Sequence, residues 1–175
     1  MQADLIVRNG TVVSHRGIDQ LDIAIKDEKI IAIGSLADRT ASEEIDATGL
    51  HVLPGVIDSQ VHFREPGLEH KEDLATGTAA AALGGVTAIF EMPNTNPLTL
   101  TAEDMADKVR RGREKAWTDF AFFIGAAAEN VENLPMLERQ EGVSGVKLFM
   151  GSSTGSLLVD NDADIRRVLK AGFRR

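Results

Sequence analysis

The chain has 175 residues, of which 43% are hydrophobic and 26% charged, a composition typical of a globular protein that buries a core. Its formal net charge of -8 argues against a nucleic acid or an anionic membrane as the main partner. With no cysteine, no secretory signal and no apolar run near the ~20 residues that cross a bilayer, we expect a cytoplasmic protein without disulfides or thiolate metal sites.

The first part of the chain, residues 1–52, is predicted to be a β-rich segment. The runs at 3–14 and 21–35 are rich in Val and Ile, which favour strands. Asn9-Gly10 and Asp27-Glu28-Lys29 interrupt these runs with residues that favour turns. We therefore predict a small antiparallel sheet or half-sandwich between residues 3 and 52.

The second part, residues 53–175, alternates strands with helices. Strands are predicted at 56–63, 86–93, 118–127 and 142–151. Helices are predicted at 70–85, at 101–116 with Thr101 as N-cap, at 129–140 with an interruption at Pro135, and from 161 with Asn161 or Asp162 as cap. This alternation indicates an α/β fold with a parallel sheet and helical crossovers.

Polar clusters fall at the predicted strand ends, where parallel βα arrays place their functional groups. Gln60, His62 and Arg64 alternate, so an extended segment would place them on one face. His62 suits a metal ion and Arg64 suits a carboxylate, although a half-buried histidine and a surface arginine are the plainer alternatives. Asn94 follows the second strand and by itself indicates only a turn.

Lys147 lies inside the apolar run 146–149, where an ammonium ion is costly to bury. Three explanations remain open: an acidic partner, a side chain that reaches the strand end, or conversion to a carbamylated lysine able to bridge two metal ions.

Residues 55–97 resemble the dihydroorotase branch of the amidohydrolase superfamily. The resemblance rests on "REPG", "HKED", "GGVT" and "MPNT" at their spacings, and "LPGVID" and "GVKLFMG" extend it over nearly the whole chain. A weaker resemblance connects the chain to hydantoinases and allantoinases, which share the fold and a similar lysine-bearing strand.

The dihydroorotase resemblance implies the N-terminal part of a (β/α)8 TIM barrel, about four βα units, preceded by one part of a composite β-sandwich. It implies reversible ring-amide hydrolysis of dihydroorotate to N-carbamoyl-aspartate, a step of pyrimidine biosynthesis, with one or two zinc ions. His62 matches the second histidine of the family's H-x-H metal motif, and Lys147 matches a carbamylated bridging ligand. Arg64 and Asn94 match the pair that holds the substrate carboxylate.

Two departures from the family pattern matter. Gln60 stands where the family has its first histidine, and an amide is a poor zinc ligand, so one metal position is expected to be weak or lost. A complete barrel takes about 250 residues, and the general-base aspartate is expected beyond Arg175. We therefore predict no catalytic residue in this chain, no activity of this chain alone, and a fragment, a shortened form or a premature stop.

Three functional readings follow from this pattern. Arg64, Asn94 and Lys147 favour an enzyme that acts on a small-molecule substrate. A homo-oligomer is one expected form of this enzyme. Gln60 favours a non-catalytic scaffold partner of aspartate transcarbamoylase. The third reading is another cyclic amidohydrolase, a hydantoinase or an allantoinase. In every case the open half-barrel is expected to expose apolar interior positions, for which we name Val61, Phe90, Phe122 and Val146.

Overall fold

The computed structural model describes residues 2–151 and 157–172. The chain divides into two compact units, Met1–Pro54 and Gly55–Arg175, and each is described by itself. The boundary predicted from the sequence lies two residues earlier along the chain. No described helix is both long enough and apolar enough to cross a bilayer.

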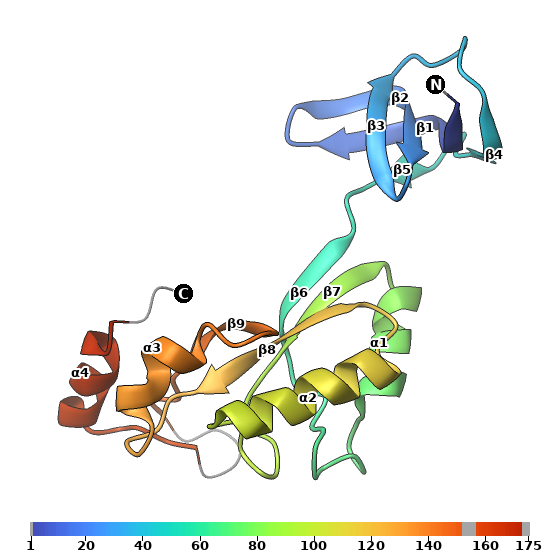
Figure 1. Cartoon of the computed structure of the whole chain (residues 1–175). Helices are drawn as coiled ribbons and strands as arrows, with labels where there is room; N and C mark the ends of the chain where they lie inside the picture. Colours follow the sequence, from blue (N-terminus) through green and yellow to red (C-terminus); the bar gives the residue numbers. More distant parts are fainter. Residues whose placement is uncertain (1, 152–156, 173–175) are drawn as a thin grey trace. The chain divides into compact units, whose positions relative to one another are not determined.

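The first unit is a five-stranded mixed sheet (Figure 1). Its strands are β1 (Ala3–Ser14), β2 (Gly17–Lys26), β3 (Lys29–Gly34), β4 (Ala41–Asp46) and β5 (His51–Val52). β2 pairs antiparallel with β1 and β3, but β4 and β5 both run parallel to β1. The prediction of an antiparallel sheet is therefore wrong for these last two strands, which follow one another along the same edge of β1 and run in its direction.

The two predicted turns in this unit have different outcomes. Asp27 and Glu28 adopt positive φ values of 48° and 62° and form the tight turn between β2 and β3. Asn9 also has a positive φ, 58°, but β1 continues through it with a shift in register between Val7 and Gly10. Asn9-Gly10 is thus a β-bulge within one strand and not a turn. The glycine is required there, because a Cβ atom would lie 2.6 Å from Val52.

The second unit is a four-stranded parallel sheet with helical crossovers. Its strands lie in the order β6 (Val56–Val61), β7 (Val86–Glu91), β8 (Asp119–Gly125) and β9 (Val143–Lys147). The helices are α1 (Leu74–Leu83), α2 (Ala102–Lys115), the 3-10 turn η1 (Val131–Asn133) with α3 (Leu134–Leu137), and α4 (Asp162–Lys170). These four βα units form a half-barrel, which confirms the fold class.

Side-chain caps fix where the helices of this unit begin. The Asp73 and Asn161 side chains accept hydrogen bonds from backbone N–H groups of the first turns of α1 and α4. Thr101 and Asp104 form a reciprocal capping box at the start of α2. Pro135 does not interrupt a helix as predicted, but lies in the first turn of α3, where its missing N–H needs no partner.

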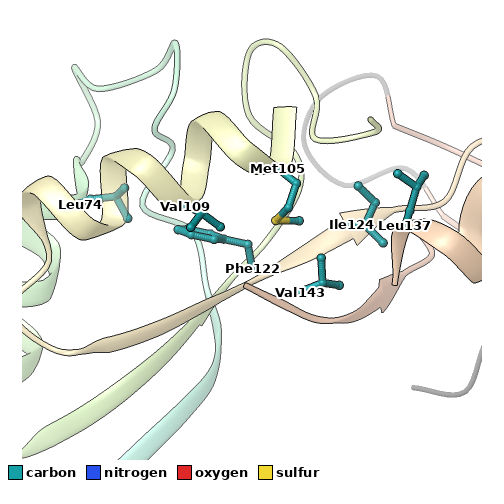
Figure 2. Packing of buried hydrophobic residues seen from close by; sticks show 7 residues of the cluster. All are labelled: Leu74, Met105, Val109, Phe122, Ile124, Leu137 and Val143. Carbon is teal, nitrogen blue, oxygen red and sulfur yellow. The ribbon is translucent and has the colours of Figure 1, made fainter. Parts of the chain in front are cut away.

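The core of the second unit lies between the sheet and α2 (Figure 2). Met105 and Val109 of α2 pack with Phe122 and Ile124 of β8, and the same cluster includes Leu74, Leu137 and Val143. Phe122 is fully buried on this helix-covered face, so its assignment to the barrel interior is wrong. Its neighbour Phe123 points to the other face, where its ring contacts that of Phe90 edge to face at 6.4 Å between centroids.

Candidate functional site

The predicted site residues come from the carboxyl ends of three strands. His62 follows the end of β6 at Val61, Asn94 follows the end of β7 at Glu91, and Lys147 is the last residue of β9. Parallel strands bring these ends to one edge of the sheet. There the His62 Nδ1 atom lies 2.9 Å from the Asn94 Oδ1 atom. The structure therefore joins two of the predicted residues across neighbouring strands.

This hydrogen bond orients the His62 ring. With the Asn94 amide oxygen as acceptor, Nδ1 carries the proton and Nε2 keeps the lone pair that could bind a metal ion. Partial burial lowers the pKa of His62, and the positive charge of Arg64 lowers it further, while the bond to Asn94 acts in the opposite direction. A lowered pKa means a neutral imidazole at neutral pH, which is the form that coordinates metals.

Lys147 belongs to the same cluster. Its charge contributes to the lowered pKa of His62. Its Nζ atom lies 5.1 Å from the centre of the Phe149 ring, and its backbone oxygen accepts a hydrogen bond from Ala126 at 2.8 Å. The side chain is half-buried, so the lysine reaches the strand end over an aromatic neighbour.

Gln60 lies within β6, whereas Arg64 departs from the predicted alternation. Gln60 is exposed within β6, and its backbone N–H donates to the Asp58 carboxylate at 3.0 Å. β6 ends at Val61, and Arg64 has a φ of 67°, a left-handed conformation. The prediction that Gln60, His62 and Arg64 share one face of an extended segment is therefore wrong at Arg64, where the backbone leaves the extended conformation.

Sequence reasoning missed a buried ion pair at the end of β7, the strand that Asn94 follows. Glu91 and Lys108 have side chains that are each 1% exposed, and the Lys108 ammonium group donates to the Glu91 carboxylate. Lys108 Nζ also donates to the Met92 backbone oxygen at 3.0 Å. Burial raises the pKa of Glu91 and lowers that of Lys108. The available signal was a single charge inside the apolar strand sequence "VTAIFEMP".

Sequence reasoning also missed Glu65, whose side chain is fully buried. Its carboxylate accepts hydrogen bonds from the Leu74 N–H at 3.0 Å, from Arg111 Nη1 at 3.1 Å and from Lys115 Nζ at 2.5 Å. Burial alone would raise the pKa of Glu65, but the hydrogen bonds from Lys115, Leu74 and Arg111 together hold it below its usual value. Glu65 therefore joins the segment after β6 to the start of α1 and to α2.

A zinc ion needs several imidazole, carboxylate or thiolate ligands around one point. Within residues 2–151 and 157–172, no group of three or more such side chains is placed to hold a metal ion. His62 offers one imidazole nitrogen, whereas Gln60 offers only a neutral amide. The described residues thus supply one good ligand and do not by themselves fit a complete zinc site.

A half-barrel whose strand ends carry His62, Asn94 and Lys147 is the architecture of a cyclic amidohydrolase. A family model described as dihydro-orotase-like matches residues 49–141. The chain belongs to this dihydro-orotase-like family.

Known proteins similar to the chain include allantoinases and hydantoinases. The allantoinase of Desulfitobacterium hafniense (strain Y51) is 41% identical over 147 residues, which is 83% of this chain and 32% of that protein. The L-hydantoinase (dihydropyrimidinase) structure from Arthrobacter aurescens matches with a TM-score of 0.89 and 32% identity over 97% of this chain and 38% of its own. The chain thus spans about a third of the length of the relatives it matches.

A more distant structure shares the fold alone. The N-acyl-D-glutamate deacylase of Bordetella bronchiseptica, solved with zinc and a phosphonate inhibitor, matches with a TM-score of 0.68 at 13% identity, over 98% of this chain and 43% of its own. The named relatives favour the allantoinase or hydantoinase reading of the sequence over dihydroorotase itself.

Proposed function

We propose that this chain supplies the first half of a cyclic amidohydrolase barrel that opens the ring amide of allantoin or a hydantoin. The observation that carries the proposal is the likeness of nearly the whole chain to an L-hydantoinase structure, with a TM-score of 0.89. The 41% identity to an allantoinase supports the same substrate class. Both substrates carry a five-membered ring with adjacent amide groups.

In this proposal each strand end has a distinct role. His62 contributes one zinc ligand through Nε2, and Asn94 holds its ring in position through Nδ1. Arg64 offers a planar cation to a substrate oxygen. Gln60 and Lys147 remain candidates for the metal position, Lys147 only if it is carbamylated. Other zinc ligands come from outside the described residues.

Dihydroorotase activity is the second candidate. It is favoured by Arg64 and Asn94 at adjacent strand ends, because dihydroorotate carries a carboxylate that an arginine fork binds well and allantoin carries none. In that reading Asn94 would have to serve both the substrate and His62, whose ring it already contacts.

The test is a chimera in which residues 1–175 replace the matching N-terminal segment of the Desulfitobacterium hafniense allantoinase. Zinc-loaded, folded chimera is assayed for ring opening of allantoin, hydantoin and dihydroorotate. Turnover of allantoin or hydantoin above that of dihydroorotate supports the proposal, and the reverse order favours the second candidate. A folded chimera that opens none of the three rings overturns both.

A further inference from the structure

Lys108 lies on the buried face of α2, and its ammonium group contacts the end of β7. Three groups lie around this ammonium: the Glu91 carboxylate, the Met92 backbone oxygen at 3.0 Å, and the Phe122 ring, whose centre is 5.0 Å away. An ammonium group has three N–H donors, so a carboxylate, a carbonyl oxygen and an aromatic face can occupy all of them. The buried lysine is therefore connected to both sides of the Glu91–Met92 peptide unit.

Met92 is held from two sides. It follows the last residue of β7, and its backbone N–H donates to the Val61 backbone oxygen at 3.0 Å. Its own backbone oxygen accepts the bond from Lys108. Met92 is thus attached to β6 through its N–H group and to α2 through its oxygen.

Both residues of the candidate site adjoin this segment. His62 follows Val61 directly, and Asn94 lies two positions after Met92. The distance of 2.9 Å between His62 Nδ1 and Asn94 Oδ1 therefore depends on how the ends of β6 and β7 lie against each other. A relative displacement of about 1 Å would take these two atoms beyond hydrogen-bond distance.

Stability alone explains poorly why a lysine occupies position 108. Burial of an ion pair takes two charges out of water, and well-packed apolar residues of similar volume often give equal or greater stability. An apolar side chain at this position would, however, leave the Met92 oxygen without its donor from α2. The bond to the backbone beside the site is therefore the feature that an apolar replacement lacks.

We propose that Lys108 is a positioning residue that, through its bond to the Met92 oxygen, holds the end of β7 against that of β6 and so maintains the His62–Asn94 hydrogen bond. This bond keeps the imidazole proton of His62 on Nδ1 and the lone pair on Nε2. The use of Nε2 as a metal ligand rests on the proposed function, whereas the position of the proton does not and can be measured separately.

The test determines the tautomer of His62 in the metal-free 175-residue chain by magic-angle-spinning NMR of histidine labelled with ¹⁵N, which does not require a monomeric sample. At pH 8 the neutral imidazole predominates, because its ordinary pKa is about 6.5. The ¹⁵N shifts of a neutral ring then show which nitrogen carries the proton. A His62→Gln spectrum identifies the signals of His62, and the exposed His15, His51 and His70 serve as internal references.

Two variants separate the bond to Met92 from the ion pair. Glu91→Gln removes the carboxylate charge but keeps Lys108, whose amine can donate to the Met92 oxygen whether or not it is protonated. Lys108→Met/Glu91→Leu replaces the pair with apolar residues, so no charge is buried alone but the bond to Met92 is lost. The matched control is Arg113→Met, which removes from the same helix an exposed cation that pairs with Glu141.

We expect His62 to keep the Nδ1–H form in the original chain, in Glu91→Gln and in the control. In the double variant the ratio of the Nδ1–H to the Nε2–H form should fall at least about tenfold, and the Met92 amide should exchange with solvent at least about tenfold faster. The Phe122 amide, which donates to the Gly142 oxygen at 2.8 Å, should keep its protection in every variant.

An unchanged tautomer ratio in the double variant overturns the proposal. An equal change in Glu91→Gln also overturns it, because the effect would then come from the charge of the pair. So does a loss of protection at Phe122 as large as that at Met92, which would indicate a purely structural role. If the double variant does not fold, Lys108→Met/Glu91→Gln, which keeps a polar group at position 91, decides by the same criteria. A chimera that opens no ring substrate would remove the proposed function and leave this result standing.

Discussion

Single side chains at the strand ends take their roles from partners on other elements. His62 and Asn94 are 32 positions apart in the chain, and the sequence identified each through its own strand end, but their contact depends on the register of β6 against β7. Glu65, Glu91 and Lys108 were not predicted, because charged residues are expected at the surface unless a partner is known. The cations that pair with Glu65 and Glu91 lie on α2, between 17 and 50 positions away.

The planar guanidinium group of Arg64 gives the first prediction. Arg64→Lys in the chimera keeps the positive charge but loses the planar, bidentate geometry. We expect kcat/KM for the ring substrate to fall by about 10- to 100-fold, with the zinc content unchanged. Steady-state kinetics and metal analysis of the same preparations check this. A parallel fall in bound zinc would show that Arg64 supports the metal position instead.

The buried Glu91–Lys108 pair gives a prediction about stability. Lys108→Met leaves the Glu91 carboxylate buried without its cation, and we expect the free energy of unfolding to fall by about 3–5 kcal/mol. The double variant Lys108→Met/Glu91→Gln should lose less free energy of unfolding than the two single variants lose together, since neither charge is then left buried alone. Urea unfolding of the four proteins measures this coupling, and strictly additive losses would mean that the two groups act independently.

Asp22, a carboxylate of β2, gives a pH-dependent prediction. The Asn9 N–H is the main cause of its lowered pKa, burial opposes this, and the Leu36 N–H and Arg8 lower it further. A group whose pKa is lowered by folding stabilises the protein above its unfolded pKa of about 4, and this contribution is lost as the pH falls through the lower folded value. Asp22→Asn should therefore cost about 1 kcal/mol or more at pH 7.

The difference between this variant and the original chain should shrink as the pH is lowered from 7 toward 2, because the stabilisation is lost as the pH falls through the lowered folded pKa of Asp22. Asp19→Asn, an exposed position on the same strand, is the matched control and should have little effect at either pH. Urea unfolding followed by circular dichroism at the two pH values makes the comparison. A loss that persists unchanged at low pH would show that charge is not the cause.

At the scale of elements, local chemistry predicted the helix starts well. Thr101 and Asn161 cap α2 and α4 as expected, because a cap depends on residues three positions apart. Asn9-Gly10 was misread, since the same residues that favour a turn also favour a bulge, and only pairing with β2 separates the two. Pro135 was misread because a proline can start a helix as readily as break one.

The capping box of α2 gives a prediction at this scale. Thr101→Ala removes the acceptor for the Asp104 N–H at the start of the helix that holds Glu65 and Glu91. We expect a loss of about 1 kcal/mol in the free energy of unfolding, whereas Thr101→Ser, which keeps the hydroxyl, should lose only a few tenths. Urea unfolding of the two variants compares them, and equal losses would point to the methyl group rather than the cap.

At the scale of the whole molecule, the family resemblance implied the half-barrel, whereas the alternation of strands and helices by itself predicted a parallel sheet. It did not indicate which face of each strand the helices cover. In β8 the residues Phe120, Phe122 and Phe123 are all aromatic, so period-two alternation gives two apolar faces without distinguishing them. The distinction comes from Met105 and Val109 of α2, which pack on Phe122. The contact between Lys147 and the Phe149 ring could not be predicted from strand alternation either, because Phe149 lies beyond the end of β9.

The open edge of the half-barrel gives the last prediction. β6 is an edge strand of its sheet, and its Val56 and Ile57 side chains are 53% and 60% exposed. Unpaired strand edges with apolar side chains favour association. We therefore expect the 175-residue chain to self-associate and to bind a hydrophobic dye at neutral pH.

Ile57→Lys should reduce both effects, because a charge on an edge strand opposes edge-to-edge pairing. Leu83→Lys, which changes an equally apolar and 92% exposed residue at the end of α1, should not. Sedimentation velocity and dye fluorescence compare the three proteins, and a monodisperse monomer without dye binding would show that the β6 edge is covered in solution.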